Sequence, residues 1–217
     1  MEERKENIKK LIKAIVSFVT EKDGYVTKTK LLKYLYLIDI EYYRFFRCTF
    51  TGFNWIYYHY GPWAKEYEEI YENMIKTGEL RVTQGSRPDL ETQFISTEEK
   101  VDPEGLFKGI ELQIAIRRLL TRWSDEPLGR MLDYVYFYTE PMENADKGRP
   151  LDFSKISEEK EGSYSLPKST LSRHQIDEIR KNFYKKRPSQ KICPQPKIEY
   201  DEVYWKGVED LLKDEEY

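Results

Sequence analysis

One segment constrains the fold of this chain more than any other, because it is apolar on every side. Residues 31–43 have helical spacing, yet their aliphatic and aromatic side chains are spread around the whole circumference: Leu31, Leu32, Leu35, Tyr36, Ile38, Tyr42 and Tyr43. A helix at a protein surface keeps a polar face, so this helix is expected to run through the middle of the core. Thr27 can cap its first turn.

Further helices are predicted on both sides of this central segment. Apolar residues recur every three or four positions over residues 4–20, 62–76, 103–121 and 125–138, which is the pattern of a helix with one buried face. Pro62 suits the first position of the second of these helices, where a missing N–H costs nothing. Ser124 can cap the last one.

Two stretches have the composition of strands. Residues 55–59 are rich in aromatic side chains and end at Gly61-Pro62, which predicts a short strand. Residues 79–97 predict a hairpin, with strands at 80–83 and 92–96 around a Gly-Ser-Arg-Pro-Asp turn. The expected fold class is therefore α+β and predominantly helical, with a helical core and one small antiparallel sheet of about three strands.

The chain divides by composition near residue 152. Residues 1–151 are expected to form the helical domain, and the sequence then becomes polar and loses its periodicity up to about residue 168. Residues 152–217 are expected to be a C-terminal appendage of unknown role. It carries two amphipathic helical patterns, 171–187 and 199–212, separated by a proline-containing stretch.

Composition argues against several functional classes. The formal net charge is -3, so no overall field attracts the chain to nucleic acid. No run approaches the roughly 20 apolar residues that cross a bilayer, and the first ten residues are too charged for a signal peptide. Two widely separated cysteines, Cys48 and Cys193, fit a reducing compartment. We expect a cytoplasmic protein with no membrane partner.

Residue types that support catalysis are scarce. The chain has only 2 histidines, which leaves few ways to build a histidine-based zinc site or a nucleophile–histidine pair. It has no glycine-rich phosphate-binding motif. We therefore expect no enzyme activity, no metal and no cofactor. Asp39 stands out because a carboxylate within an apolar helix needs a partner; a structural hydrogen bond is favoured over a hydrolase role.

Three motifs carry a resemblance to a known family. The run from Lys30 to Asp39, which includes Leu31, Lys33, Leu35 and Tyr36, is similar to the helix signature of the SocA/Panacea family. Tyr60-Gly61-Pro62-Trp63 resembles its YGP motif. Thr139-Glu140-Pro141 resembles its closing element, although Met142 stands where the family usually has tryptophan.

The resemblance implies an antitoxin domain of a toxin–antitoxin system, which neutralises a cognate toxin by direct binding and needs no cofactor. The 18 tyrosines are more than a small core is expected to shield, so some should form an exposed patch. Aromatic side chains dominate binding hot spots. The candidate partner-binding residues lie in the aromatic strand and the helix after it: Trp55, Tyr57, Trp63 and Tyr67.

Two alternatives stay open at this point. The first is a phage- or mobile-element-associated regulator that binds nucleic acid through a basic helix at 173–187, where lysine and arginine are interleaved with aromatic residues. The second is a hydrolase in which Asp39 acts with another carboxylate, although no such partner is evident. The oligomeric state is not predicted by the sequence.

Overall fold

The computed structural model describes residues 2–59, 61–84 and 93–157. All of them belong to the first of the two units into which the chain divides, Met1–Gly162. No described helix has both the length and the apolar character that a bilayer span requires. The described elements, in chain order, are α1 (Glu2–Glu21), α2 (Lys28–Phe46), β1 (Ile56–Tyr58), β2 (Gly61–Trp63), α3 (Lys65–Lys76), β3 (Arg81–Gln84), β4 (Gln93–Ser96), η1 (Glu104–Leu106), α4 (Ile110–Ser124), α5 (Leu128–Tyr138), η2 (Glu140–Met142) and η3 (Phe153–Lys155).

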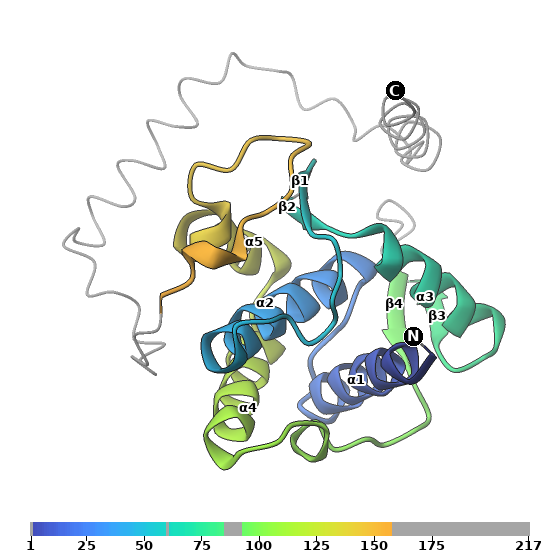
Figure 1. Ribbon diagram of the computed structural model, residues 1–217. Helices are drawn as coiled ribbons and strands as arrows, with labels where there is room; N and C mark the ends of the chain where they lie inside the picture. The colour runs from blue at the N-terminus through green and yellow to red at the C-terminus, as the bar shows by residue number, and fades with distance from the viewer. Residues whose placement is uncertain (1, 60, 85–92, 158–217) are drawn as a thin grey trace, which may run out of the picture. The chain divides into compact units, whose positions relative to one another are not determined.

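Helix α2 is the centre of this unit (Figure 1), as its apolar circumference predicts. Every residue from 30 to 40 is buried, and α1, α4, α5, β2 and β4 all pack against the helix. The hydroxyl of Thr27 accepts a hydrogen bond from the backbone N–H of Lys30 at 3.2 Å, so the expected cap is confirmed. The α+β, helix-dominated fold class is confirmed as well.

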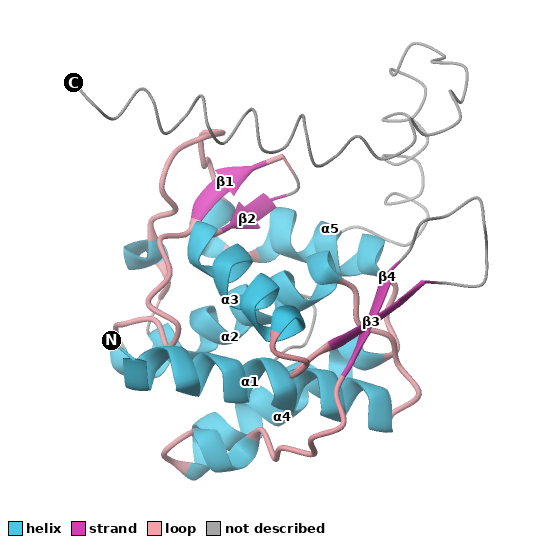
Figure 2. Cartoon of the chain, turned by 90° about the vertical axis from the view of Figure 1, so that its right-hand side faces the viewer, coloured by secondary structure: helices cyan, strands magenta, loops and turns pink. Residues whose placement is uncertain are grey.

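The sheet differs from the expectation of three joined strands. Strands β1 and β2 form one antiparallel hairpin and β3 and β4 form another, and Figure 2 shows the two hairpins apart. Pro62 lies in β2 and not at the start of α3, which begins at Lys65. A proline fits β2 because β2 is an edge strand, with one side that needs no N–H donor.

The second side of β1 is also covered, by a segment more than 80 residues later in the chain. The N–H of Tyr57 donates to the carbonyl of Arg149 at 3.0 Å, and the N–H of Leu151 donates to the carbonyl of Trp55 at 2.8 Å. The other hairpin is attached to the core by the N–H of Ile95, which donates to the carbonyl of Val26 at 2.8 Å. Long-range backbone bonds, and not a shared sheet, therefore hold both hairpins in place.

The expected cap at Ser124 is wrong. Ser124 is the last residue of α4, and its hydroxyl donates to the carbonyl of Thr121 at 2.9 Å. Helix α5 begins after Pro127. The backbone of Pro127 is extended, and its φ of -66° is the value near which the proline ring fixes this angle. The helices expected at 171–187 and 199–212 lie outside the described residues, and the domain boundary at residue 151 stays a prediction.

Removal of core volume in α2 should destabilise the unit. Leu35 is 0 % exposed, so Leu35→Ala is expected to lower the free energy of unfolding by about 2–5 kcal/mol, through lost apolar burial and the cavity left behind. Urea denaturation followed by circular dichroism measures the change. Phe137→Ala, at a side chain that is 75 % exposed, is the control and should change it by less than about 0.5 kcal/mol. Equal effects would contradict the central position of α2.

Candidate partner-binding surface

Four polar side chains interrupt the apolar surface of α2 at intervals of three residues: Lys30, Lys33, Tyr36 and Asp39. None is more than 1 % exposed. An α-helix has 3.6 residues per turn, so each step of three residues rotates the side chain to a new direction. The four groups therefore point to different neighbours, and each must find a partner there because burial without one is costly.

Asp39 has its partners in the loop that leads to β1. Its carboxylate accepts hydrogen bonds from the backbone N–H of Thr51 at 2.9 Å, from the Thr51 hydroxyl and from the indole N–H of Trp55 at 2.7 Å. Burial raises the pKa of Asp39 to about 6, while these hydrogen bonds act in the opposite direction. The carboxylate is enclosed by groups that it orders, which is the structural role that the sequence favours.

Lys33 has its partner in β2. Its amine donates a hydrogen bond to the carbonyl of Pro62 at 2.7 Å, and burial lowers the pKa of Lys33 to about 7. Gly61, beside this contact, has φ +91°, and a Cβ there would lie 3.6 Å from the Lys33 amine and 3.5 Å from the Tyr136 ring. The Gly-Pro pair of the motif thus supplies a positive φ and a carbonyl aimed at α2.

Lys30 and Tyr36 connect α2 to α4 and to the end of α5. The Lys30 amine donates to the carbonyl of Ser124 at 3.2 Å and lies 4.4 Å from the centre of the Tyr25 ring. The Tyr36 hydroxyl lies 3.1 Å from the Thr139 hydroxyl, and the latter donates to the carbonyl of Val135 at 2.6 Å. Tyr36 thus joins the first motif to the third although they are distant in sequence, and Lys30 contacts residues outside the motifs.

The remaining motif residues are part of the packing. Leu31 and Leu35 are in the core, and Pro141 is buried in η2. Met142, at the position where the family usually has tryptophan, is buried too. Tyr60 lies outside the described residues. The structure therefore gives the motifs it describes a role in holding the fold together.

The expectation of exposed aromatic side chains at the first candidate residues is wrong for three of the four. Trp55 is 3 % exposed, Trp63 8 % and Tyr67 0 %, and Tyr57 is half-buried. Their polar atoms find acceptors inside: the Trp63 indole donates to Glu68 at 3.2 Å and the Tyr67 hydroxyl to the carbonyl of Lys28 at 2.8 Å. Satisfied polar atoms allow large aromatic residues to be buried. Their part in partner binding stays a prediction that exposure no longer supports.

A different set of aromatic residues is exposed, on the outer side of α5. Phe137 is 75 % exposed and Tyr138 46 %, and Tyr134 is half-buried beside them. These three residues, which we call the α5 aromatic surface, share one helix face because they are three and four positions apart. Tyr134 and Tyr138 are stacked, with ring centres 5.9 Å apart.

Residues of α4 pack against the α5 aromatic surface and hold Tyr134 in place. The ring of Tyr134 lies 5.2 Å from buried Trp123, and the guanidinium of Arg122 lies 4.8 Å from the centres of both rings. Such cation–π contacts favour one arrangement of the side chains. A surface that is already ordered loses less entropy when a partner binds.

The sequence contains a signal for this surface that apolar periodicity alone does not reveal. Aromatic residues occupy positions 134, 136, 137 and 138. Consecutive positions on a helix point about 100° apart, so four aromatic residues in five positions cannot all face the core. Some of them must therefore be exposed.

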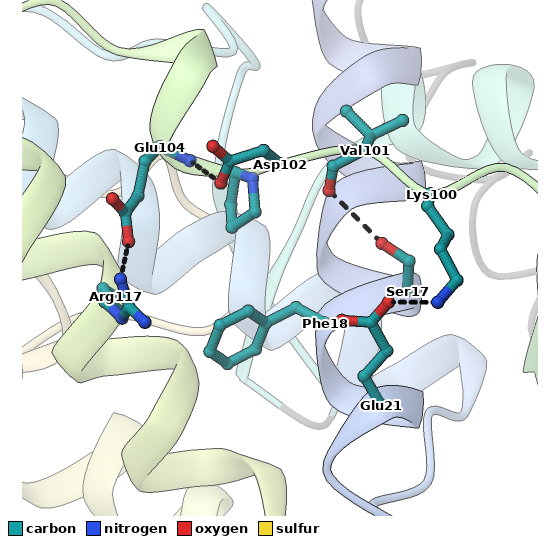
Figure 3. Close-up of a pocket in the computed structure, with 9 residues that line it drawn as sticks. Ser17, Phe18, Glu21, Lys100, Val101, Asp102, Glu104 and Arg117 are labelled. Carbon is teal, nitrogen blue, oxygen red and sulfur yellow. Dashed lines mark hydrogen bonds and ion pairs between the residues drawn. The ribbon is translucent and has the colours of Figure 1, made fainter.

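A hollow of about 440 Å³ lies between α1 and the segment that leads to η1 (Figure 3). Its rim carries two ion pairs, Lys100 with Glu21 at 3.0 Å and Arg117 with Glu104 at 2.7 Å. Ser17 donates to the carbonyl of Val101 at its base. These four charged side chains are paired with one another, so they are not available to bind a charged ligand in the hollow.

Comparison with known proteins agrees with the motifs. The family model described as "Antitoxin SocA-like, Panacea domain" matches residues 31–190. The match includes the second and third motifs and all of the first motif except Lys30, and it continues past the expected boundary at residue 151. A search of curated proteins and a search of solved structures found no match.

The hydrogen bonds of Asp39 should contribute measurably to stability. Asp39→Asn keeps the shape of the side chain but replaces a charged acceptor of three hydrogen bonds by a neutral amide that offers a donor on one side. The free energy of unfolding at pH 7 should fall by about 1–3 kcal/mol, as measured by urea denaturation. Asp146→Asn, at an exposed aspartate, is the matched control. If both variants were equally stable, the network would not carry the role assigned to it.

The buried amine of Lys33 should make stability depend on pH. Its pKa is about 7 in the folded chain and near 10.5 when unfolded, so the unfolded chain binds the proton more tightly between these values. The free energy of unfolding should therefore rise from pH 7 to pH 9, by up to about 1.4 kcal/mol per pH unit. Lys33→Met lacks this contribution, and its curve should be flatter over the same interval. Parallel curves would mean that Lys33 keeps an ordinary pKa.

Proposed function

The chain belongs to the SocA-like Panacea domain family of antitoxin-like proteins, and on that premise we propose that it is an antitoxin that neutralises a cognate toxin by binding it directly. In this proposal the chain acts as a binding protein in the cytoplasm and not as an enzyme. Asp39 is then a structural residue, consistent with its enclosed carboxylate.

The observation that carries the proposal is the α5 aromatic surface. Phe137 exposes three quarters of its side chain to water, which is unfavourable in a monomer unless another molecule covers it. Aromatic and arginine side chains that are held in place are the groups most often found at the centre of protein interfaces. We propose that Phe137 and Tyr138 contact the toxin, with Arg122 and Tyr134 supporting them.

Antitoxin activity can be tested by a growth assay that does not require the toxin to be identified first. Each reading frame next to the gene is induced alone and together with this chain, and growth is measured. The expected result is one neighbour that arrests growth alone and is neutralised by co-expression. If no neighbour is toxic, or if co-expression never restores growth, the proposal fails.

The surface can be tested separately with the purified toxin and the full chain. Phe137→Ala/Tyr138→Ala should raise the dissociation constant about 100-fold or more, because hot-spot residues contribute about 2 kcal/mol each or more. Isothermal titration calorimetry measures the constant, and circular dichroism confirms folding. Glu72→Ala/Lys76→Ala, at two exposed residues of α3, is the control. Unchanged binding by the folded double variant would place the interface elsewhere.

A further inference from the structure

Helix α4 has a second exposed apolar surface that the α5 aromatic surface does not include. Ile110 is 73 % exposed and Ile114 45 %, although the opposite face of α4 is buried against α1 and α2. Figure 1 shows α4 at the outside of the helical unit. The outward face, here called the α4 face, consists of six exposed residues: Ile110, Glu111, Ile114, Arg117, Arg118 and Thr121.

The apolar part of the α4 face, Ile110 and Ile114, is displaced from the α5 aromatic surface along the helix axis. Trp123, which contacts Tyr134, is nine residues after Ile114, and this corresponds to roughly 13 Å at 1.5 Å per residue. The apolar area extends instead toward the end of α2. Phe46 is 46 % exposed and packs on Tyr42, which is also close to Phe107 just before α4.

The charges on the α4 face are arranged so that the face is complementary to itself. Glu111 and Arg118 are seven residues apart, or two helical turns, so they lie on the same flank of the helix. When two identical helices pack antiparallel about a twofold axis at Ile114, residue 110 of one helix is level with residue 118 of the other, and residue 111 is level with residue 117. Arg118 is only one residue, about 1.5 Å, further along the axis, and it is on the same flank as Glu111. Glu111 of each helix then faces Arg118 of the other, and the two Ile114 side chains meet at the axis.

We propose that two copies of this chain associate through antiparallel α4 helices, with Ile114 on the twofold axis. A parallel pair would place Glu111 beside Glu111 and Arg118 beside Arg118, where like charges repel. Symmetric dimers use the same patch on both subunits, as this arrangement does. The contact consists of one helix face with Phe46 at each end, and its area is smaller than that of a standard interface. The dimer dissociation constant should therefore be in the micromolar range.

Charge reversal tests the pairing directly. Sedimentation equilibrium of the full chain should give a mass that rises toward twice the monomer value as concentration increases. Glu111→Arg and Arg118→Glu should each raise the dimer dissociation constant about tenfold, and the double variant should return it to near the wild-type value. Circular dichroism checks that each variant is folded. A monomer at all concentrations, or a dimer that ignores both single reversals, would overturn the proposal.

A cysteine at the axis tests the geometry. In a chain carrying Cys48→Ser and Cys193→Ser, Ile114→Cys should form an intersubunit disulfide under mild oxidation, because the two β-carbons at the axis come close enough. Thr121→Cys should not, because residue 121 faces residue 107 of the partner subunit. Cross-linking at residue 121 and not at 114 would contradict the twofold axis at Ile114.

The dimer and the proposed function can fail independently. Ile114→Asp should abolish the dimer, and Phe137→Ala/Tyr138→Ala should leave it intact. If the toxin, and not a second copy, covers the α4 face, Ile114→Asp will weaken toxin binding while the wild-type chain sediments as a monomer. That result would overturn the dimer and keep the antitoxin proposal.

Discussion

The need to satisfy polar groups inside a buried helix determines how this unit is assembled. Helix α2 is enclosed along 11 consecutive residues, from Lys30 to Ile40, and four of its buried polar side chains, Lys30, Lys33, Tyr36 and Asp39, form hydrogen bonds with groups outside the helix. Each one meets a group from a different part of the chain: the end of α4, strand β2, Thr139 after α5, and the loop before β1. A misplaced neighbour would leave both members of a pair without a partner, at a cost of about 1–3 kcal/mol for each group. Apolar packing alone tolerates small shifts of one element against another, and these hydrogen bonds do not.

This arrangement separates the residues that carry the family resemblance from those available to a partner. The polar motif residues of α2 are buried, as are Gly61, Pro62 and Thr139. Two of these residues of α2 contact other motif residues: Lys33 contacts Pro62 and Tyr36 contacts Thr139. The exposed apolar side chains of α4 and α5 lie outside the motifs. They form two surfaces, the α5 aromatic surface around Phe137 and the α4 face around Ile114. The contacts that hold the fold together are internal. Residues on the outer faces of α4 and α5 can therefore differ between proteins with this fold, because substitution of an exposed residue usually changes stability little.

The range of each interaction decides which features of the fold are predictable from the sequence. The cap at Thr27 and the burial of α2 depend on residues a few positions apart, and both are predictable. A proline at position 62 is compatible with the first turn of a helix and also with an edge strand. Only the pairing of Tyr57 with Pro62 shows that the residue lies in a strand. Trp63 and Tyr67 are expected at the surface as candidates for binding a partner, and their burial requires partners for their polar atoms. Those partners, Glu68 and the carbonyl of Lys28, exist in the core, and no local pattern reveals that a donor and an acceptor will meet there.

The sequence by itself determined that this chain forms a helical unit around residues 31–43 and that its three motifs resemble those of the SocA/Panacea family. Both conclusions rest on periodicity and on short motifs, which are properties of neighbouring residues. The tertiary structure alone decided which aromatic side chains are covered. A helix buries whichever face meets the rest of the protein, and that choice depends on long-range contacts such as those of Trp55 with Asp39 and of Trp123 with Tyr134. The surface left for a partner is what remains after those contacts are made. The aromatic residues at 134–138 indicate that some of them must be exposed, but only the fold decides which ones.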